Sequence, residues 1–406
     1  MAIPASFKDE LIARSDILDI VSDYVTLTPK GGSYWGLCPF HGEKTPSFHV
    51  LPDRQLYHCF GCGKGGGVIS FIMDVENLPF LDAMRLLAKR AGMEFPEGEM
   101  DEGNRRKRSR LLSLNKEAAR FFHSQLVSPV GQAGLDYLRR RGLSKQIITR
   151  FGLGFAPESW DSLLKAMAQK GYDKRDLLDA GLAVSNQKGA IYDRFRNRVM
   201  FPIIDLRGDV IGFGGRVLGD GTPKYLNSPD SVVFNKSRNL FALNLAKNTK
   251  LGRIILTEGY MDTISLYQSG FDCAVASLGT ALTADHAKLL SRFTKEVVIC
   301  YDADSAGIQA ANRAIPMLEK TGLKVRVLRV TGAKDPDEFL KKYGPDAFSR
   351  LLDQSENYVE YNLRQLQSNY DLSDPVQKTE FARAGAEILA QLDSPVEREV
   401  YAGQLS

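Results

Sequence analysis

The sequence lacks several features that would place it in other classes of protein. No apolar run reaches the ~18 residues that a membrane-spanning helix needs, and the first ten residues lack the basic and then apolar profile of a secretory signal. Only five cysteines occur among 406 residues, and a chain of this length can bury a core without disulfide staples. We therefore expect a cytoplasmic protein of two or three domains with no membrane partner.

Other absences narrow the function. No Gly-x-x-x-x-Gly-Lys-Ser/Thr loop is present, which excludes a fused P-loop helicase. Internal repeats and low-complexity tracts are also missing. The net charge is only +4, a value that permits a nucleic-acid partner but does not demand one.

The patterns of polar and apolar residues divide the chain into regions. Residues 96–110 are acidic and then basic and contain too few apolar side chains for a core, so we predict a flexible linker there, with the basic run as a solvated charge block. Strands alternate with helices from residue 252 onward, which predicts a parallel sheet. The predicted fold class is multidomain α/β (α+β overall), with regions at 1–95, 96–110, 111–250, 251–340 and 341–406.

Three cysteines and one histidine have the spacing of a zinc site. Cys38 and His41 form one x₂ pair, and Cys59 and Cys62 form the second pair after a further seventeen residues. Zinc binds four such ligands at tetrahedral corners, and four protein ligands leave no open position. We therefore predict one structural zinc ion in a ribbon over residues 38–62. His49 and His58 are the rivals of His41; His58 precedes Cys59 directly and should point to the opposite face of its strand.

Acidic residues follow three separate apolar strands. Glu258 follows the strand at 253–257, the strand ending at residue 301 precedes two more acids, and the strand at 324–330 precedes another pair; these four acids are Asp302, Asp304, Asp335 and Asp337. The carboxyl ends of strands in an open α/β sheet form the ligand-binding edge. Clustered carboxylates repel one another unless a cation lies between them, and oxygen ligands select Mg²⁺ or Mn²⁺. The alternative is that these acids are helix N-caps and turn residues.

These motifs resemble a known family. Residues 258–262, 301–307 and 335–337 look like the TOPRIM motifs, and residues 38–48 and 223–229 are similar to signatures of the same family. The order of zinc ribbon, linker and TOPRIM core resembles the bacterial replicative primases of the DnaG type over essentially the whole chain. On this resemblance residues 111–250 are the N-terminal subdomain of a polymerase core, 251–340 the TOPRIM subdomain and 341–406 a C-terminal helical subdomain.

The resemblance implies an enzyme, a nucleotidyltransferase. It implies a DNA-directed RNA polymerase that makes short RNA primers on single-stranded DNA from ribonucleoside triphosphates. Catalytic roles fall on Glu258, Asp302 and Asp304, with Mg²⁺ or Mn²⁺ held by these acids and by Asp335 and Asp337. Family members usually carry a further domain that binds the replicative helicase. This sequence stops at Ser406, where the polymerase core should finish, so we expect the helicase-binding domain to be absent and the protein to be a monomer.

A basic segment between the zinc ribbon and the acids is the candidate nucleic-acid and nucleotide surface. We call its residues the basic ridge: Arg194, Arg196, Arg216, Lys224 and Asn227. Cations that follow a phosphate backbone and groups that stack on bases are what a template requires. A solvated charged face is the alternative, and the resemblance favours a function.

Two other functions compete with primer synthesis. A topoisomerase or nuclease could share the TOPRIM motifs, but a topoisomerase needs a separate domain with a nucleophilic tyrosine, and a nuclease has no evident need for a zinc ribbon. A single-strand-binding module built on the ribbon is the second alternative, and the complete set of acids argues against it.

Overall fold

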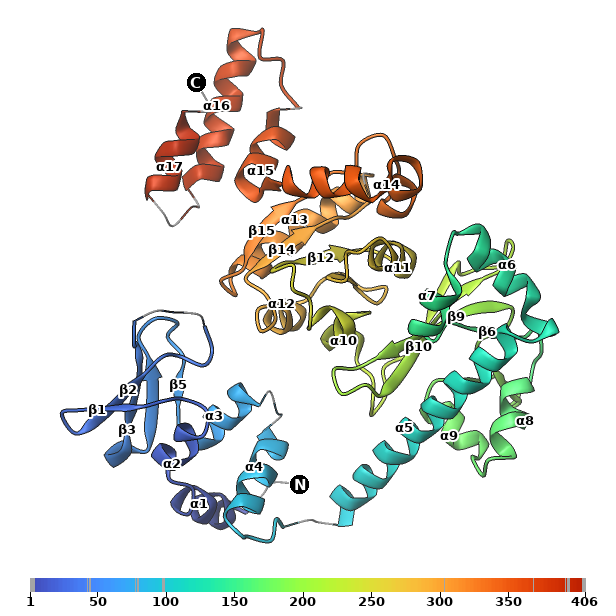
Figure 1. Ribbon diagram of the computed structural model, residues 1–406, viewed down its shortest axis with the longest axis horizontal. Coiled ribbons are helices and arrows are strands. Elements are labelled where there is room, and N and C mark those ends of the chain that lie inside the picture. The colour runs from blue at the N-terminus through green and yellow to red at the C-terminus, as the bar shows by residue number, and fades with distance from the viewer. Residues whose placement is uncertain are drawn as a thin grey trace. The chain divides into compact units, whose positions relative to one another are not determined.

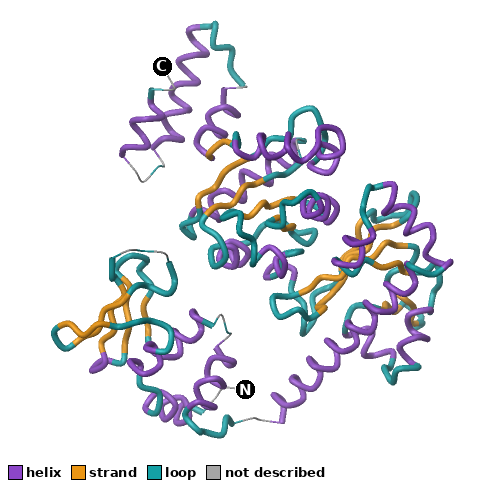
Figure 2. Tube along the Cα trace, in the orientation of Figure 1, coloured by secondary structure: helices purple, strands orange, loops and turns teal. Residues whose placement is uncertain are grey.

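The computed structural model describes residues 4–41, 43, 45–76, 78, 80–96, 99–302, 304–367, 369–390, 392 and 395–403. Its helices and strands are labelled in Figure 1 and coloured by type in Figure 2. The chain divides into two compact units, Met1–Arg106 and Lys107–Ser406. Each unit has its own hydrophobic core. Within the described residues, no helix combines the length and apolar character that crossing a membrane requires.

The first unit is built on a small antiparallel sheet. Its strands lie in chain order: β1 (Thr28–Lys30), β2 (Ser33–Gly36), β3 (Phe48–Leu51), β4 (Leu56–Cys59) and β5 (Gly65–Gly66). Successive side chains alternate between the two faces of a strand. Phe48, Val50 and Tyr57 are therefore buried on one face. His49 and His58 are paired across β3 and β4 on the other face. The buried face packs against the helices α1 (Ala5–Ala13), α2 (Ile17–Ser22), α3 (Val68–Val75) and α4 (Phe80–Arg90).

The predicted flexible linker is wrong for most of its length, because residues 99–110 are helical. They form the first turns of α5 (Glu99–Leu126), while residues 97 and 98 lie outside the described part of the chain. Arginine and lysine are good helix formers, and the later turns of α5 anchor the helix through Leu111, Leu114 and Phe122 in the core of the second unit. Arg110 also forms two hydrogen bonds of 2.7 and 2.6 Å with the Asp176 carboxylate.

The second unit begins with an antiparallel subdomain. A sheet in the order β11-β10-β9-β6 contains β6 (Gly154–Ala156), β9 (Arg198–Ile204), β10 (Val210–Val217) and β11 (Tyr225–Asn227). A separate hairpin pairs β7 (Ala183–Ser185) with β8 (Ile191–Asp193). The surrounding helices are α6 (Gln132–Arg140), α7 (Lys145–Arg150), α8 (Ser162–Ala168) and α9 (Lys174–Asp179). The short α10 (Leu243–Ala246) packs into the core of the sheet that follows.

A parallel-sheet subdomain follows, as the alternation of strands and helices predicts. Its strand order is β13-β12-β14-β15-β16, with β12 (Ile254–Thr257), β13 (Ala274–Ala276), β14 (Glu296–Ile299) and β15 (Lys324–Val327) parallel and the short β16 (Glu356–Asn357) antiparallel. The register of β12 and β14 pairs Leu256 with Ile299. These strands consequently deliver the residues that follow them to one edge of the sheet.

Helices cover both faces of the parallel sheet (Figure 1). Alternation along β12 places Ile254 in a core with α12 (Ala284–Leu290) and α13 (Ser305–Glu319), whereas Ile255 faces the core formed with α11 (Tyr260–Gln268) and α14 (Pro336–Asp353). The two faces are thus fixed by a strand pattern that is apolar at every position, which is typical of a parallel sheet buried on both sides.

Three helices end the described chain: α15 (Tyr358–Gln367), α16 (Pro375–Ala390) and α17 (Pro395–Ala402). They share a small core of Val359, Leu363, Leu389 and Leu392. Tyr361 of α15 is buried in the core of the parallel-sheet subdomain instead. The helical bundle is therefore attached to the sheet by its first helix.

Candidate functional site

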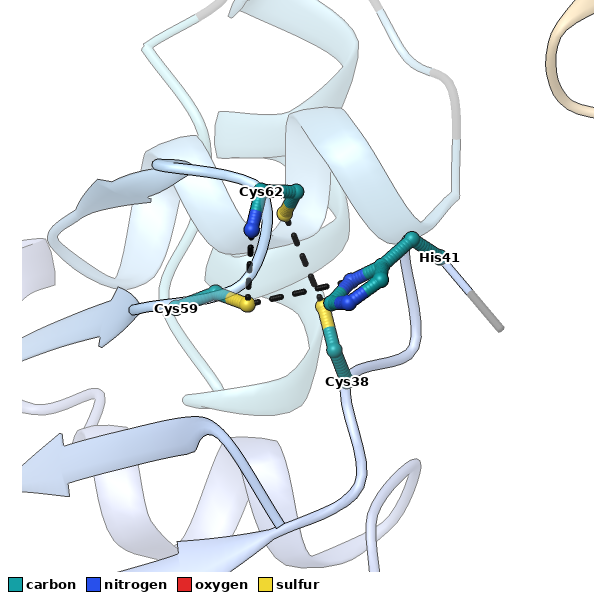
Figure 3. A group of neighbouring side chains, drawn as sticks. All are labelled: Cys38, His41, Cys59 and Cys62. Carbon is teal, nitrogen blue, oxygen red and sulfur yellow. Dashed lines mark hydrogen bonds between the residues drawn. The ribbon is translucent and has the colours of Figure 1, made fainter. Parts of the chain in front are cut away.

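The four predicted zinc ligands lie together. The ligand atoms of Cys38, His41, Cys59 and Cys62 are all within 4.8 Å of one another (Figure 3). The first pair lies between β2 and β3, and Cys59 ends β4. Gly61 is needed in the second loop, because a Cβ there would lie 2.6 Å from His41 Nε2. Three thiols and an imidazole at this spacing fit the ligand set of a closed, structural zinc site.

A carboxylate orients the histidine of this site. His41 Nδ1 lies 3.8 Å from Cys59 Sγ, and His41 Nε2 lies 3.3 Å from Glu43 Oε2. Glu43 also accepts hydrogen bonds from the Cys38 amide at 2.7 Å and the Ser47 hydroxyl at 2.5 Å. The Ser47 hydrogen bond lowers the pKa of the Glu43 carboxyl, although burial opposes it. This is the arrangement of a carboxylate, histidine and zinc in which the outer group fixes the ring and strengthens the ligand.

The rival histidines belong to a different feature, an aromatic face on the solvent side of the sheet. Trp35 stacks on His49 with ring centroids 4.5 Å apart and on Phe60 at 5.8 Å. His58 contacts Phe60 edge-on at 4.8 Å. Phe60 is 64% exposed, and Lys30 lies 5.6 Å from the Trp35 ring. We call Lys30, Trp35, His49, His58 and Phe60 the aromatic face.

The predicted acids gather at the carboxyl ends of the parallel strands. Glu258 follows β12, and its Oε1 accepts a hydrogen bond of 3.2 Å from the amide of Asp302 after β14. Gly307 permits this approach, since a Cβ there would lie 2.2 Å from the Asp302 carbonyl oxygen and 2.9 Å from Glu258 Oε1. The sheet topology thus brings two acids that are distant in sequence into contact.

The helix-cap interpretation of the acids is also correct, for two of them. Asp304 Oδ1 accepts a hydrogen bond of 2.9 Å from Gly307 at the start of α13. Asp335 Oδ1 accepts one of 2.8 Å from Glu338 at the start of α14. Each cap uses one carboxylate oxygen and holds the side chain at the sheet edge. Capping therefore positions these acids and leaves their charge in place.

The electrostatics of this edge favour a bound cation. Burial raises the pKa of Glu258, and the charges of Asp302 and Asp304 raise it further. Burial also raises the pKa of Asp302, with contributions from Asp335 and Asp304, while Lys334 and Lys224 lower it. Among the described residues, no group of acids is drawn together as tightly as the zinc ligands. A divalent cation bound by these carboxylate oxygens would relieve the repulsion between the acids.

Asp262 is an acid of this edge that our site prediction did not include. Burial raises the pKa of Asp262 to about 8, with further contributions from Asp335, Asp302 and Asp337. The residue stands in the first turn of α11, four positions after Glu258. The sequence signal that could have identified it is an acid in the first turn of the helix directly after β12 and Glu258.

Asp337, which we predicted as a magnesium ligand, is buried, and its carboxylate is bonded to protein donors. Its side chain is 2% exposed. The carboxylate accepts hydrogen bonds from Ser265 Oγ at 2.6 Å, Arg141 Nη1 at 2.6 Å and Lys341 Nζ at 2.7 Å. Two cations and a hydroxyl already neutralise this carboxylate and engage both of its oxygens.

Three arginines of the antiparallel subdomain line a pocket of about 480 Å³. Arg196 lies over the Trp160 ring at 4.2 Å and over Tyr192 at 5.0 Å. Burial lowers the pKa of Arg194, whose Nη2 donates a hydrogen bond of 3.2 Å to the Asn227 carbonyl. Arg198, which we did not predict, is buried beside them and bonded to the Gly215 carbonyl at 3.0 Å. Trp160 is 64% exposed and was also missed.

The remaining ridge residues take two different positions. Arg216 lies over the Tyr137 ring at 4.5 Å. Lys224 is exposed and lowers the pKa of Asp302, so it faces the acids. Asn227 has both ends of its amide engaged: Nδ2 donates to the Leu278 carbonyl at 2.8 Å, and Oδ1 accepts from the Tyr260 hydroxyl at 2.7 Å. Asn227 thus anchors β11 to the parallel-sheet subdomain through one hydrogen bond at each end of its amide.

Comparison with known proteins agrees with this architecture. Residues 3–103 match a CHC2 zinc finger, 121–247 the N-terminal domain of a DNA primase catalytic core, and 255–340 a Toprim-like domain. The DNA primase of Clostridium acetobutylicum is 45% identical over 395 residues, which are 97% of this chain and 66% of that protein. This chain therefore spans just under two thirds of that relative.

Solved structures give the same result. The zinc-binding and RNA polymerase domains of Aquifex aeolicus primase are 35% identical with a TM-score of 0.62, covering 100% of this chain and 96% of that one. A DnaG primase catalytic domain bound to single-stranded DNA is 40% identical with a TM-score of 0.65, covering 74% of this chain and 98% of that one.

One prediction about partners is overturned by the family comparison. Residues 359–406 match the DnaB-helicase binding domain of primase, so the expected absence of a helicase-binding region is wrong. We expected this absence because the resemblance places the end of the polymerase core near Ser406, whereas the family comparison places the helicase-binding region within these last helices.

The ribbon of three cysteines and one histidine is a zinc ribbon, and the acid-lined edge belongs to a Toprim-like domain, which implies a divalent metal for catalysis. With relatives of this identity over nearly its whole length, the chain belongs to the family of bacterial DnaG-type primases, enzymes with a zinc-binding domain and an RNA polymerase domain.

Proposed function

We propose that this chain synthesises short RNA primers on single-stranded DNA by metal-dependent nucleotidyl transfer from ribonucleoside triphosphates. The observation that carries this proposal is the juxtaposition of the acids at the sheet edge with a lysine on the basic ridge: Lys224 is close enough to Asp302 to lower its pKa. One surface holds the cation, and the adjacent surface holds the polyanion. We place this activity in the cytoplasm, where a bacterial chromosome is copied.

The acids have two roles in this reaction, metal binding and proton transfer. Asp302, Asp304 and Asp335, with Glu258 and Asp262, would hold Mg²⁺ or Mn²⁺, because these hard ions prefer oxygen ligands. A bound ion of this kind neutralises the triphosphate and lowers the pKa of an attacking hydroxyl. Glu258 accepts the proton of the ribose hydroxyl at its carboxylate. The hydroxyl oxygen then bonds to the α-phosphorus, and the bond to the pyrophosphate oxygen breaks.

Glu258 is suited to this role by its environment. Burial and the neighbouring Asp302 raise its pKa, which makes the carboxylate a stronger base than a solvated glutamate. The Asp302 amide, 3.2 Å from Oε1, fixes the orientation of the group.

The template binds, on this proposal, through stacking and charge. The Trp160–Arg196–Tyr192 stack offers a planar, cationic platform beside Arg194 and Arg198. In the first unit, the aromatic face offers a second platform with Lys30 at its border. Bases stack on such side chains with about 1–3 kcal/mol each and little sequence preference.

Helicase recruitment is the second partner interaction we propose. Residues 359–406 carry the match to a DnaB-helicase binding domain. Three valines of α16 and α17 are more than half exposed: Val376, Val396 and Val400. Val396 and Val400 lie four residues apart, on one face of α17. If these helices bind the helicase, the double variant Val396→Asp/Val400→Asp will lose co-sedimentation with a bacterial DnaB helicase while retaining primer synthesis; retained co-sedimentation would exclude this surface.

Primer synthesis on a gel tests the main proposal. Wild-type protein, Mg²⁺, single-stranded DNA and labelled ribonucleotides should give short RNA. Asp302→Ala should lower the rate by at least about 100-fold, because a metal ligand and its charge are lost. Asp346→Ala, an exposed acid of α14, is the matched control and should retain the wild-type rate. DNA cleavage in place of RNA synthesis would instead indicate the nuclease alternative.

A further inference from the structure

The buried carboxylate of Asp337 lies at the centre of a network that joins the two subdomains of the second unit. Its three donors come from three helices or helix ends: Ser265 from α11, Lys341 from α14 and Arg141 from the end of α6. The Arg141 and Asp337 atoms are 2.6 Å apart, and the residues are separated by 196 positions in sequence. Breaking a buried pair by removing one partner leaves an uncompensated charge, which is strongly destabilising.

The same network holds Asp262 at the acid edge. The backbone amide of Asp337 donates a hydrogen bond of 3.4 Å to Asp262 Oδ1. In return, Ser265, which is three residues beyond Asp262 in α11, donates to the Asp337 carboxylate. These two bonds clamp the first two turns of α11 to the first turn of α14. Asp335, the N-cap of α14, is fixed by the same clamp.

Arg141 links this clamp to the basic ridge. Arg141 Nε donates a hydrogen bond of 3.0 Å to the Tyr137 hydroxyl, and the Tyr137 ring lies under Arg216 at 4.5 Å. The turn that carries Arg141 is held from the other side by Gln268 of α11. Its amide donates to the Gly142 carbonyl at 2.9 Å and accepts from the Ser144 amide at 2.8 Å.

We propose that Arg141 and Asp337 are positioning residues that hold Asp262 and Asp335 in metal-binding geometry and keep the basic ridge beside them. Asp337 itself ligates no metal in this arrangement. The inference rests on the proposed function of the acid edge. Outer groups that orient metal ligands typically contribute 10–100-fold to metal affinity or activity, so the pair acts through the acids it places.

The substitution Arg141→Met distinguishes the positioning role from direct metal ligation by Asp337, because the two predict opposite changes in metal affinity. If Asp337 were a magnesium ligand, removing the competing arginine would increase negative charge and tighten metal binding. If the pair positions the acids, the same change weakens binding. We expect the Kd for Mn²⁺, measured by calorimetry on zinc-loaded protein, to rise about tenfold. An unchanged or lower Kd in folded Arg141→Met protein would overturn the proposal.

Further variants control for folding and for charge. Arg141→Lys retains a cation and should recover most of the Mn²⁺ affinity. Ser265→Ala removes one neutral hydrogen bond and should have a smaller effect in the same direction. Arg139→Met, which removes an exposed arginine paired with Asp136 at 3.7 Å on the same helix, should leave the affinity unchanged. A fall in Tm without a change in Kd would show that the pair is merely structural and would contradict the proposal.

The wild-type protein distinguishes the two levels of inference. If it binds no Mn²⁺ and makes no RNA, the proposed function of the acid edge fails. If it binds Mn²⁺ and makes RNA while Arg141→Met binds Mn²⁺ equally well, the proposed function stands and the positioning role fails.

Discussion

The zinc site and the acid edge bind cations by opposite routes. The zinc ligands lie within residues 38–62, and their ligand atoms are already within 4.8 Å of one another. The acids come from the ends of separate parallel strands and from two helix caps, and burial and mutual repulsion raise the pKa values of Glu258, Asp262 and Asp302. The first site is built for one permanent ion, whereas the second is built to exchange ions and substrates.

The cores beneath the two sites explain the difference. The first unit has a single core, which its small sheet shares with four helices. In small zinc domains the binding free energy of the ion contributes directly to folding. The acid edge lies on a parallel sheet with an extensive core on each face. We therefore expect zinc to stabilise its unit strongly, and the catalytic metal to contribute little to folding.

The largest effect should follow from Cys59→Ser. Losing one thiolate opens the zinc site, and structural zinc contributes roughly 10–16 kcal/mol of binding free energy to folding in small zinc domains. We expect zinc content, measured by atomic absorption, to fall below stoichiometry and the first unit to lose its cooperative unfolding transition. His58→Gln, an adjacent position that faces away from the ion, should retain full zinc. If Cys59→Ser protein retained one zinc ion and an unchanged unfolding transition, the zinc site would not differ from the acid edge in its contribution to folding.

The next largest effect concerns the acid edge and should leave folding intact. Asp262→Asn removes a carboxylate that already tends to be protonated, since burial raises its pKa to about 8. The Tm in the absence of divalent metal should therefore change little, while Mn²⁺ affinity should fall roughly tenfold or more. Asp346→Asn is the control. A large loss of Tm with unchanged metal affinity would mean that Asp262 is a structural acid.

A smaller effect is expected at the basic ridge. Lys224→Ala removes an exposed cation that faces Asp302 and should weaken single-stranded DNA or nucleotide use without a change in Tm. Loss of one phosphate contact should reduce the slope of affinity against salt concentration by about 1. Lys188→Ala, an exposed lysine of the β7–β8 hairpin, should leave both quantities unchanged. Equal slopes and rates for wild type and Lys224→Ala would assign this lysine to a solvated face.

The smallest effect should appear at the pocket that α13 and α17 both line. Burial raises the pKa of Glu319 to about 7, and the charge of Glu397 adds to it. Between about pH 5 and 7, Glu319 is therefore protonated in the folded state and ionised in the unfolded state. The free energy of unfolding should consequently fall as pH rises across this range. Glu319→Gln should remove this dependence and raise stability at pH 8 by less than about 1 kcal/mol. Glu380→Gln is the control; the same pH dependence in both variants would exclude the Glu319 charge as its source.

Local patterns in the sequence predicted one site well and the other in part. The zinc ligands are set by short spacing on adjacent strands, so Cys38, His41, Cys59 and Cys62 could be identified before any tertiary information. The strand ends likewise predicted Glu258 and Asp302 at one sheet edge. The role of Asp337 could not be inferred this way, because its partners Arg141 and Ser265 are 196 and 72 positions away.

The environment of individual side chains was the other feature that the sequence did not predict. Among the aromatic residues of the ribbon, alternation along β3 and β4 buries Phe48 and Tyr57, while Trp35 and Phe60 stack on the opposite face. Asn227 carries a side chain that suits nucleotide binding, yet the fold uses it as an anchor for β11. The prediction of a flexible linker was wrong for a related reason. The charged residues at 99–110 have no core of their own, but they continue a helix whose later turns are anchored by buried apolar residues.

Anomalous scattering from crystals of zinc-loaded protein soaked in Mn²⁺ tests the central claim most directly. We expect a zinc peak among Cys38, His41, Cys59 and Cys62, and a separate manganese peak bounded by the carboxylates of Glu258, Asp302 and Asp304. No peak should lie within the ~2.2 Å ligand distance of Asp337. Manganese bound to Asp337, or absent from the acid edge at concentrations that support RNA synthesis, would contradict the account.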